Sequence, residues 1–137
     1  MVKSTAILGS TGSIGRQSIA VCRARGIRVT ALTTNKNVEL LLKQIEEFKP
    51  EYAAASDTEA AEKLRSALAG TDITVGPAGE EGLRLAATWR DTDCVVTAVS
   101  GAVGLRPTLD AIAGKKRIAL ANKETPVSYT HLRAHET

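Results

Sequence analysis

The chain has 137 residues, enough for one domain with its own core, and its 43% hydrophobic and 24% charged residues argue against disorder. Its net charge of +3 comes without aromatic residues among the basic ones, which does not favour nucleic-acid binding. No apolar run approaches the roughly 18 residues of a membrane span. Aromatic residues make up only 3%, so the core must be aliphatic, as in helices packed on a parallel sheet.

The first third of the chain alternates between strand and helix. An apolar strand is expected at 5–8, followed by glycines and a short apolar stripe typical of a helix. The segment "RVTAL" at 28–32 predicts the second strand. A helix is predicted over 38–48, because apolar residues recur there at helical spacing, and Pro50 ends it.

The remainder continues this alternation. A third strand is expected at 52–55, and Ser56 stands three residues before Glu59, the spacing of a capping box that opens a helix ending at Gly70. Further strands are expected at 73–75, 94–99 and 117–121, and further helices at 80–88 and 105–114. Repeated β-α units with short loops predict an α/β fold with a doubly wound, mainly parallel sheet and right-handed crossovers, as in Rossmann-like nucleotide-binding domains.

The turn after the first strand reads "GSTGSIG" and predicts a phosphate-binding corner. Gly9 can turn sharply out of the strand, Gly12 can let the backbone approach a pyrophosphate, and Gly15 can let the helix pack closely on the strand. The N–H groups near Ser13 and Ile14 would then point from a helix N-terminus at an anion. The spacing is G-x-x-G-x-x-G instead of G-x-G-x-x-G, so a purely structural glycine turn is the alternative.

The end of the second strand predicts which dinucleotide binds. NAD-binding domains of this architecture usually carry an acidic residue there, which accepts a hydrogen bond from the ribose 2′-hydroxyl. Here the segment "TTNKN" has no acid and offers Lys36, which could pair with the 2′-phosphate of NADP(H). Such a charged hydrogen bond contributes about 1.5–3 kcal/mol. The sequence therefore favours NADPH over NADH, with a merely solvated lysine as the alternative.

Two motifs about a hundred residues apart carry a family resemblance. "ILGSTGSIG" and "ALANKE", in this order, together with "ALTTNKNVELLLKQIEEFKPEYAAASD" and "VVTAVSGAVGLRPTLDAI" between them, resemble the 1-deoxy-D-xylulose 5-phosphate reductoisomerase family. The resemblance covers residues 2 to about 125. It implies an NADPH-dependent, divalent-metal-dependent (Mn or Mg) oxidoreductase of non-mevalonate isoprenoid biosynthesis. It also implies a phosphorylated sugar substrate and, for the full-length protein, a homodimer.

The resemblance also assigns residues to roles. It implies that the cofactor phosphates contact Thr11, Gly12, Ser13 and Ile14, and that the 2′-phosphate loop is Asn35, Lys36 and Asn37. Cofactor contacts nearer the nicotinamide fall on Asn122 and Glu124, and a substrate contact on Lys123. The family often has Gly or Ala in place of Asn35, and we expect the loop to survive because Asn tolerates a positive φ. No catalytic residue is assigned.

The last residues, 126–137, read differently from the family. Where the family continues with Leu-Val, this chain has Pro126-Val127 and then "SYTHLRAHET". His131 and His135 are four residues apart, but no H-E-x-x-H motif or nearby third ligand accompanies them, so we predict no metal site here. The family's metal-binding Asp-Ser-Glu stretch is missing. We therefore expect an NADPH-binding domain at 1–125 and a foreign or frame-shifted tail at 126–137.

Three alternatives to this interpretation stay open. The chain could belong to another NADP-dependent dehydrogenase, such as a semialdehyde dehydrogenase, although Cys94 starts a buried strand and is a poor catalytic cysteine. It could be a non-catalytic nucleotide-binding domain, or a structural domain without a ligand. Cys22 and Cys94 lack metal-type spacing and predict two buried thiols, and the absence of a recognisable leader predicts a cytoplasmic protein.

Overall fold

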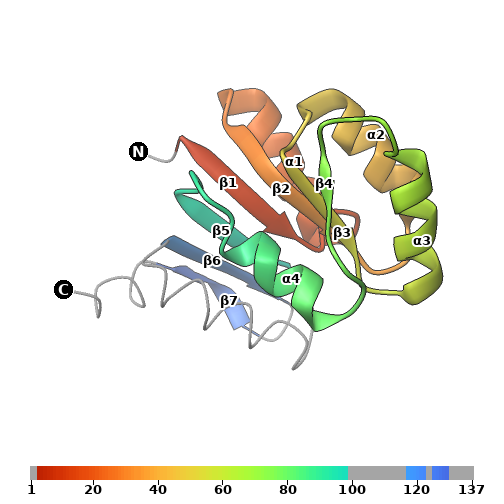
Figure 1. Cartoon of the computed structure of the whole chain (residues 1–137). Coiled ribbons are helices and arrows are strands. Elements are labelled where there is room, and N and C mark those ends of the chain that lie inside the picture. Colours follow the sequence, from red (N-terminus) through yellow and green to blue (C-terminus); the bar gives the residue numbers. More distant parts are fainter. Residues whose placement is uncertain (1–2, 99–116, 123–124, 130–137) are drawn as a thin grey trace.

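The computed structural model describes residues 3–98, 117–122 and 125–129, and within these residues seven strands form one sheet (Figure 1). Their order across the sheet is β4-β3-β2-β1-β5-β6-β7. Neighbouring strands are parallel except for the antiparallel pair of β6 and β7. The strands are β1 (Ser4–Leu8), β2 (Arg28–Thr34), β3 (Tyr52–Ala55), β4 (Thr74–Val75), β5 (Cys94–Thr97), β6 (Arg117–Asn122) and β7 (Thr125–Tyr129).

Helices cover both faces of the sheet, which confirms the predicted doubly wound architecture (Figure 1). The four helices in the described part of the chain are α1 (Ser13–Arg25), α2 (Val38–Phe48), α3 (Thr58–Ala67) and α4 (Glu80–Ala87). Apolar residues of α1, α2 and α3 share one core cluster with Ile7 of β1, while α4 packs with Ala6 and Leu8 on the opposite face. This division follows from the alternation of side chains along a strand. The helix predicted at 105–114 lies outside the described residues.

The start of α3 differs from the prediction by one residue. Asp57, not Ser56, is the N-cap, and its carboxylate accepts a hydrogen bond from the N–H of Ala60 at 3.1 Å. The N–H of Ser56 donates instead to the carbonyl of Thr34 at 2.9 Å, so Ser56 still extends the ladder between β3 and β2. The helix ends at Ala67, and Gly70 follows with a φ of 84° in the turn beyond it.

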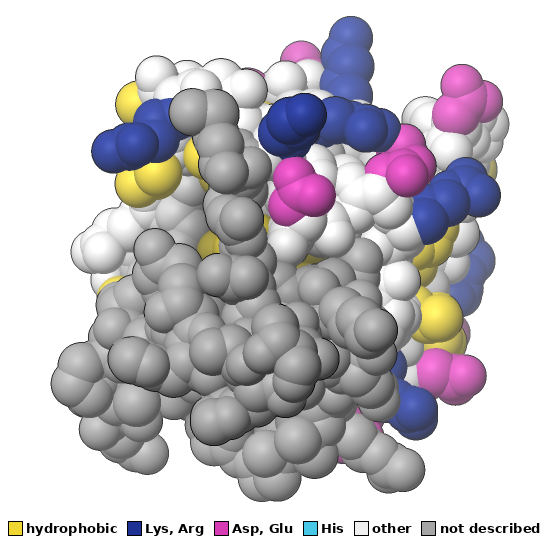
Figure 2. Space-filling view, turned by 90° about the vertical axis from the view of Figure 1, so that its left-hand side faces the viewer, with side chains coloured by type: hydrophobic (Ala, Val, Ile, Leu, Met, Phe, Trp, Pro, Cys, Tyr) yellow, Lys and Arg dark blue, Asp and Glu magenta, His cyan; other side chains and the backbone are white. Residues whose placement is uncertain are grey.

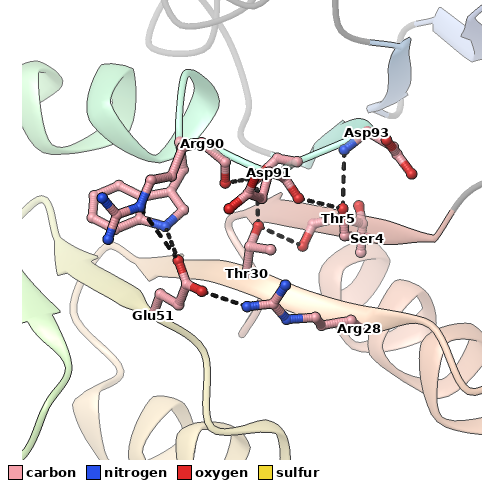
Figure 3. Close-up of polar contacts among 10 residues, drawn as sticks. Ser4, Thr5, Arg28, Thr30, Glu51, Arg90, Asp91 and Asp93 are labelled. Atoms are coloured by element: carbon pink, nitrogen blue, oxygen red, sulfur yellow. Dashed lines mark hydrogen bonds and ion pairs between the residues drawn. The ribbon is translucent and has the colours of Figure 1, made fainter.

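A polar network closes the amino-terminal edge of the sheet (Figure 3). Glu51, just before β3, accepts a hydrogen bond from the Trp89 indole at 2.9 Å and forms an ion pair with Arg28. Thr30 and Thr92 share a buried hydroxyl–hydroxyl bond of 2.6 Å. These contacts fix the loop that leads into β5. They lie at the edge opposite to the carboxyl ends of the parallel strands.

The charged surface at this edge has no single sign. Figure 2 views the left-hand side of Figure 1, where β1 begins, and shows Lys and Arg side chains interspersed with Asp and Glu. None of the helices in the described residues is both long and apolar enough to cross a membrane. Cys22 and Cys94 are both buried free thiols, as predicted, and burial raises the pKa of Cys22 to about 11.

Candidate cofactor-binding site

The glycine-rich turn lies where the strand order of the sheet reverses. From β1 the chain proceeds through β2 and β3 to β4 on one side, and then returns to place β5 on the other side of β1. The turn 9–12 leaves the carboxyl end of β1, between the ends of β2 and β5. In open α/β sheets, ligands bind in the crevice at this switch point.

The turn delivers an uncapped helix start. Gly9 has a φ of 82°, as the predicted sharp turn requires, and the N–H of Gly12 donates to its carbonyl at 3.3 Å. Gly12 is the N-cap of α1, no side chain caps the helix, and its first turn contains no acidic residue. The first N–H groups of a helix have no intrahelical acceptor and carry the positive end of the helix dipole. Ser13 and Ile14 therefore present donors suited to an anion.

The other two glycines make different contacts. A Cβ at Gly15 would lie 2.0 Å from the carbonyl oxygen of Gly9 and 2.6 Å from the Cα of Ser10. Gly15 therefore permits the predicted close packing, although it packs against the turn and not along the strand. Among the described residues, a Cβ at Gly12 would meet only that same Gly9 oxygen, at 3.8 Å. No described residue therefore blocks a close ligand at Gly12, and the described part of the site fits a dinucleotide's phosphates.

A buried polar cluster, formed by Ser10, Thr33 and Gln44, supports the turn from below. Ser10 is fully buried, and its N–H donates to the carbonyl of Thr33 at 2.8 Å. The N–H of Gly9 donates to the Thr33 hydroxyl at 2.9 Å. The Gln44 amide of α2 donates to the Ser10 carbonyl at 2.9 Å and accepts from the Ser10 hydroxyl at 2.6 Å. This cluster was not predicted from the sequence. The available signal was Gln44 itself, a polar residue three positions after Leu41 on the apolar face of the helix.

The predicted 2′-phosphate loop follows β2 directly. Asn35, Lys36 and Asn37 are all exposed. The Asn37 side chain caps α2, because its oxygen accepts a hydrogen bond from the N–H of Leu40 at 3.1 Å. This oxygen therefore already has one partner within the protein. Among the described residues other than glycine only Lys49 and Asp91 have a positive φ, so Asn35 needs no special backbone tolerance. Lys36 remains a cation available on this edge.

The structure brings the turn and the loop together. β1 and β2 are parallel neighbours, so both segments leave the same edge of the sheet. The hydroxyls of Thr11 and Thr34 are hydrogen-bonded at 2.6 Å, which links the turn to the last residue before the loop. Asn122 ends β6, whose carboxyl end lies at this edge because β5 and β6 are parallel. Lys123 and Glu124, assigned to substrate and cofactor, lie outside the described residues.

In the described residues, no three His, Cys, Asp or Glu side chains are grouped so that they could hold a metal ion. His131 and His135, for which no metal site is predicted, lie outside the described residues.

The fold and this turn define a doubly wound, Rossmann-like α/β domain of the nucleotide-binding type. Residues 5–129 match the sequence model of 1-deoxy-D-xylulose 5-phosphate reductoisomerase. The chain belongs to this family. The match includes β7, so it continues four residues past the domain boundary expected at 125.

Relatives and solved structures agree with this family assignment. The chain is 51% identical to the reductoisomerase of Agathobacter rectalis over 132 residues, which are 96% of this chain and 34% of the relative. It is 54% identical to that of Heliobacterium modesticaldum, over 93% of this chain and 34% of the relative. A crystal structure of a DOX-P reductoisomerase with magnesium superposes with a TM-score of 0.82 at 40% identity, over 90% of this chain and 32% of that one.

The reductoisomerase of Zymomonas mobilis in complex with NADPH superposes with a TM-score of 0.80 at 34% identity. The matched region is 90% of this chain and 33% of that one. The chain thus spans about a third of the length of the curated relatives it matches.

Proposed function

We propose that this chain is the NADPH-binding part of a reductoisomerase that converts 1-deoxy-D-xylulose 5-phosphate to 2-C-methyl-D-erythritol 4-phosphate. The proposal rests on the uncapped start of α1 at the switch point, where no described residue blocks the approach of a ligand to Gly12. Membership of the family supports it, as does the NADPH complex of the Zymomonas mobilis relative.

The assignment of contacts follows the geometry and the family motifs. We assign the paired phosphates to the N–H groups of 11–14, where a helix N-terminus favours negative charge. We assign the 2′-phosphate to the loop 35–37, with Lys36 as its cation. Asn122 and Glu124 are proposed to contact the cofactor nearer the nicotinamide, and Lys123 the substrate.

Within this assignment the chain's residues bind and orient. NADPH supplies the hydride for the reductive step when it is bound. The N–H groups of Ser13 and Ile14 would hold the central pyrophosphate, and Lys36 would hold the 2′-phosphate of the adenosine half. The nicotinamide half would then lie on the side of β5 and β6. The ammonium of Lys123 could stabilise an anionic substrate or a developing oxyanion.

The remaining features of the whole enzyme are proposed as well. We propose that the divalent metal, Mn or Mg, and the catalytic groups come from residues other than those of this chain. We propose that residues 1–125 form the NADPH-binding domain and that the chain departs from the family beyond the matched residues 5–129. The full-length enzyme is proposed to be a cytoplasmic homodimer.

Calorimetric titration of the purified chain tests the proposal. We expect NADPH to bind at one site per chain and more tightly than NADH, because only NADPH carries the 2′-phosphate. We also expect no conversion of the deoxyxylulose phosphate by the chain with NADPH and Mn²⁺. Absence of NADPH binding, or equal affinity for the two nucleotides, contradicts the proposal. Turnover by the chain alone contradicts the assignment of catalysis to other residues.

A further inference from the structure

Gln44 stands out because it is a polar residue buried in the core-facing side of α2. The residue is 5% exposed, and Leu41 and Ile45 on the same face of the helix are apolar. Both ends of the amide are used on one residue, since Nε2 donates to the Ser10 carbonyl and Oε1 accepts from the Ser10 hydroxyl. An apolar side chain would fill this core position equally well, and burying an amide is unfavourable unless it is hydrogen-bonded. The two bonds therefore indicate a specific task.

The geometry of a peptide bond defines that task. The Ser10 carbonyl and the Thr11 N–H belong to one planar trans peptide, in which the two groups point in opposite directions. Gln44 holds the carbonyl toward α2, so the Thr11 N–H points away from α2. In the described part of the chain, no acceptor is recorded for this N–H.

We propose that Gln44 is a positioning residue for the phosphate turn: it fixes the Ser10–Thr11 peptide so that the Thr11 N–H faces the bound phosphates. This inference rests on the proposed function for the identity of the ligand. Without Gln44, the peptide could rotate and turn the Ser10 carbonyl toward the phosphates, where an acceptor repels an anion. Gln44 acts through Thr11 and does not itself touch the cofactor.

Gln44 also connects the two phosphate sites. It lies on α2, whose N-cap is Asn37, the last residue of the 2′-phosphate loop. Its bonds to Ser10 hold the turn against the helix that this loop opens. The cofactor's pyrophosphate and 2′-phosphate would thereby be received at a fixed separation.

The test replaces Gln44 in the 137-residue chain with a side chain of similar length that cannot hydrogen-bond, as Gln44→Met. The matched control is Gln17→Met, the same change at an exposed position of α1. Three quantities are measured well below the melting temperature. They are the ¹H–¹⁵N resonance of the Thr11 amide without nucleotide, its hydrogen exchange, and the NADPH affinity. We expect Gln44→Met to shift the Thr11 amide and to weaken NADPH binding about tenfold. Gln17→Met should change neither.

The outcomes separate this inference from the proposed function. If Gln44→Met is folded, leaves the Thr11 amide unchanged and binds NADPH as the wild type does, Gln44 is only a core residue and the inference is wrong. If the wild type binds no NADPH, the proposed function fails, while the Thr11 resonance still decides whether Gln44 fixes the peptide. Should Gln44→Met not fold, the wild type gives the answer: NADPH must shift the Thr11 amide downfield, and an unaffected amide overturns the inference.

Discussion

A side-chain carbon at Gly15 would lie 2.0 Å from the Gly9 carbonyl oxygen, whereas one at Gly12 would lie 3.8 Å from it. The two glycines of one turn therefore have separable roles. Gly15 is required by the protein's own backbone, whereas no described residue fills the side of Gly12 where the ligand is proposed to bind. This difference yields a matched pair of substitutions.

Gly15→Ala should destabilise the fold. The added carbon overlaps backbone atoms of Gly9 and Ser10, which cannot move aside as a flexible side chain would. The overlap outweighs the gain in helix propensity, so we expect a net loss of about 2 kcal/mol or more in the free energy of unfolding. Urea unfolding measures this loss, and a variant as stable as the wild type would show that the turn can open without penalty.

Gly12→Ala should leave the stability nearly unchanged and weaken NADPH binding. Its φ of −78° suits alanine, and among the described residues the new carbon meets only the Gly9 oxygen at 3.8 Å, so the loss of stability should stay below about 1 kcal/mol. NADPH binding should nevertheless weaken markedly, because the methyl group occupies the path of the pyrophosphate. Unfolding and calorimetry on one preparation test this split, and an unchanged NADPH affinity would place the phosphates elsewhere.

Lys36→Ala should lower the affinity for NADPH and leave that for NADH unchanged. Removal of a hydrogen bond to a charged group weakens binding by about tenfold or more. Lys43→Ala is the matched control, since Lys43 is also exposed and the same charge is lost from the next turns of α2. If Lys36→Ala weakens NADPH and NADH binding equally, or if Lys43→Ala has the same effect, Lys36 makes no specific contact with the 2′-phosphate. The preference for NADPH would then come from the overall positive charge.

Asn37 is the N-cap of α2 and is also proposed to contact the 2′-phosphate. Two substitutions distinguish these two roles. Asn37→Ala removes the acceptor for the Leu40 N–H and should cost about 1 kcal/mol of stability. Asn37→Asp keeps a good N-cap but adds a negative charge beside the 2′-phosphate. It should therefore keep the stability and weaken NADPH selectively, as thermal melts with and without nucleotide can show. Full NADPH affinity in Asn37→Asp would exclude a direct contact.

The regular elements could be predicted from local sequence, because periodicity and turn residues specify them. The predicted helix at 38–48 and the strand at 52–55 match α2 and β3 residue for residue. Ser56 and Asp57 are both good caps one residue apart, so only the ladder contact of Ser56 decides between them. Strand β7 pairs locally with β6, with Asn122 opposite Thr125. This strand is not predicted from the sequence, because residues 126–137 are interpreted as a tail foreign to the family.

Of the candidate site, only the chemically conspicuous residues could be proposed from the sequence. The glycines and Lys36 follow from the motif and from the missing acid after β2. The support beneath the turn does not, because Gln44 reaches Ser10 across 34 residues of sequence. A glutamine on an apolar helix face is the one signal that sequence reasoning could have used.

Stability at the opposite edge of the sheet should depend on pH through Glu51 (Figure 3). The hydrogen bond from the Trp89 indole, followed by the bond and charge of Arg28, lowers the pKa of Glu51. Because the folded pKa is the lower one, the stabilisation is present above the unfolded value of about 4.3 and is lost as pH falls through the folded value. Glu51→Gln should therefore be less stable than the wild type at pH 7, and this difference should shrink toward pH 3.

Urea unfolding of both proteins across this range tests the Glu51 prediction. The pKa of Glu47 is also lowered, chiefly by its hydrogen bond from Arg23, but that ion pair is common to both proteins and cancels in the comparison. A difference in unfolding free energy that stays constant from pH 7 to pH 3 would show that the carboxylate's charge contributes nothing.

The most direct measurement of the central claim is a crystal structure of this chain grown with NADPH. We expect the paired phosphates within hydrogen-bond distance of the N–H groups of Ser13 and Ile14, with the 2′-phosphate beside Lys36. A nucleotide bound away from the carboxyl end of β1, or a crevice filled by the protein's own side chains, would contradict it.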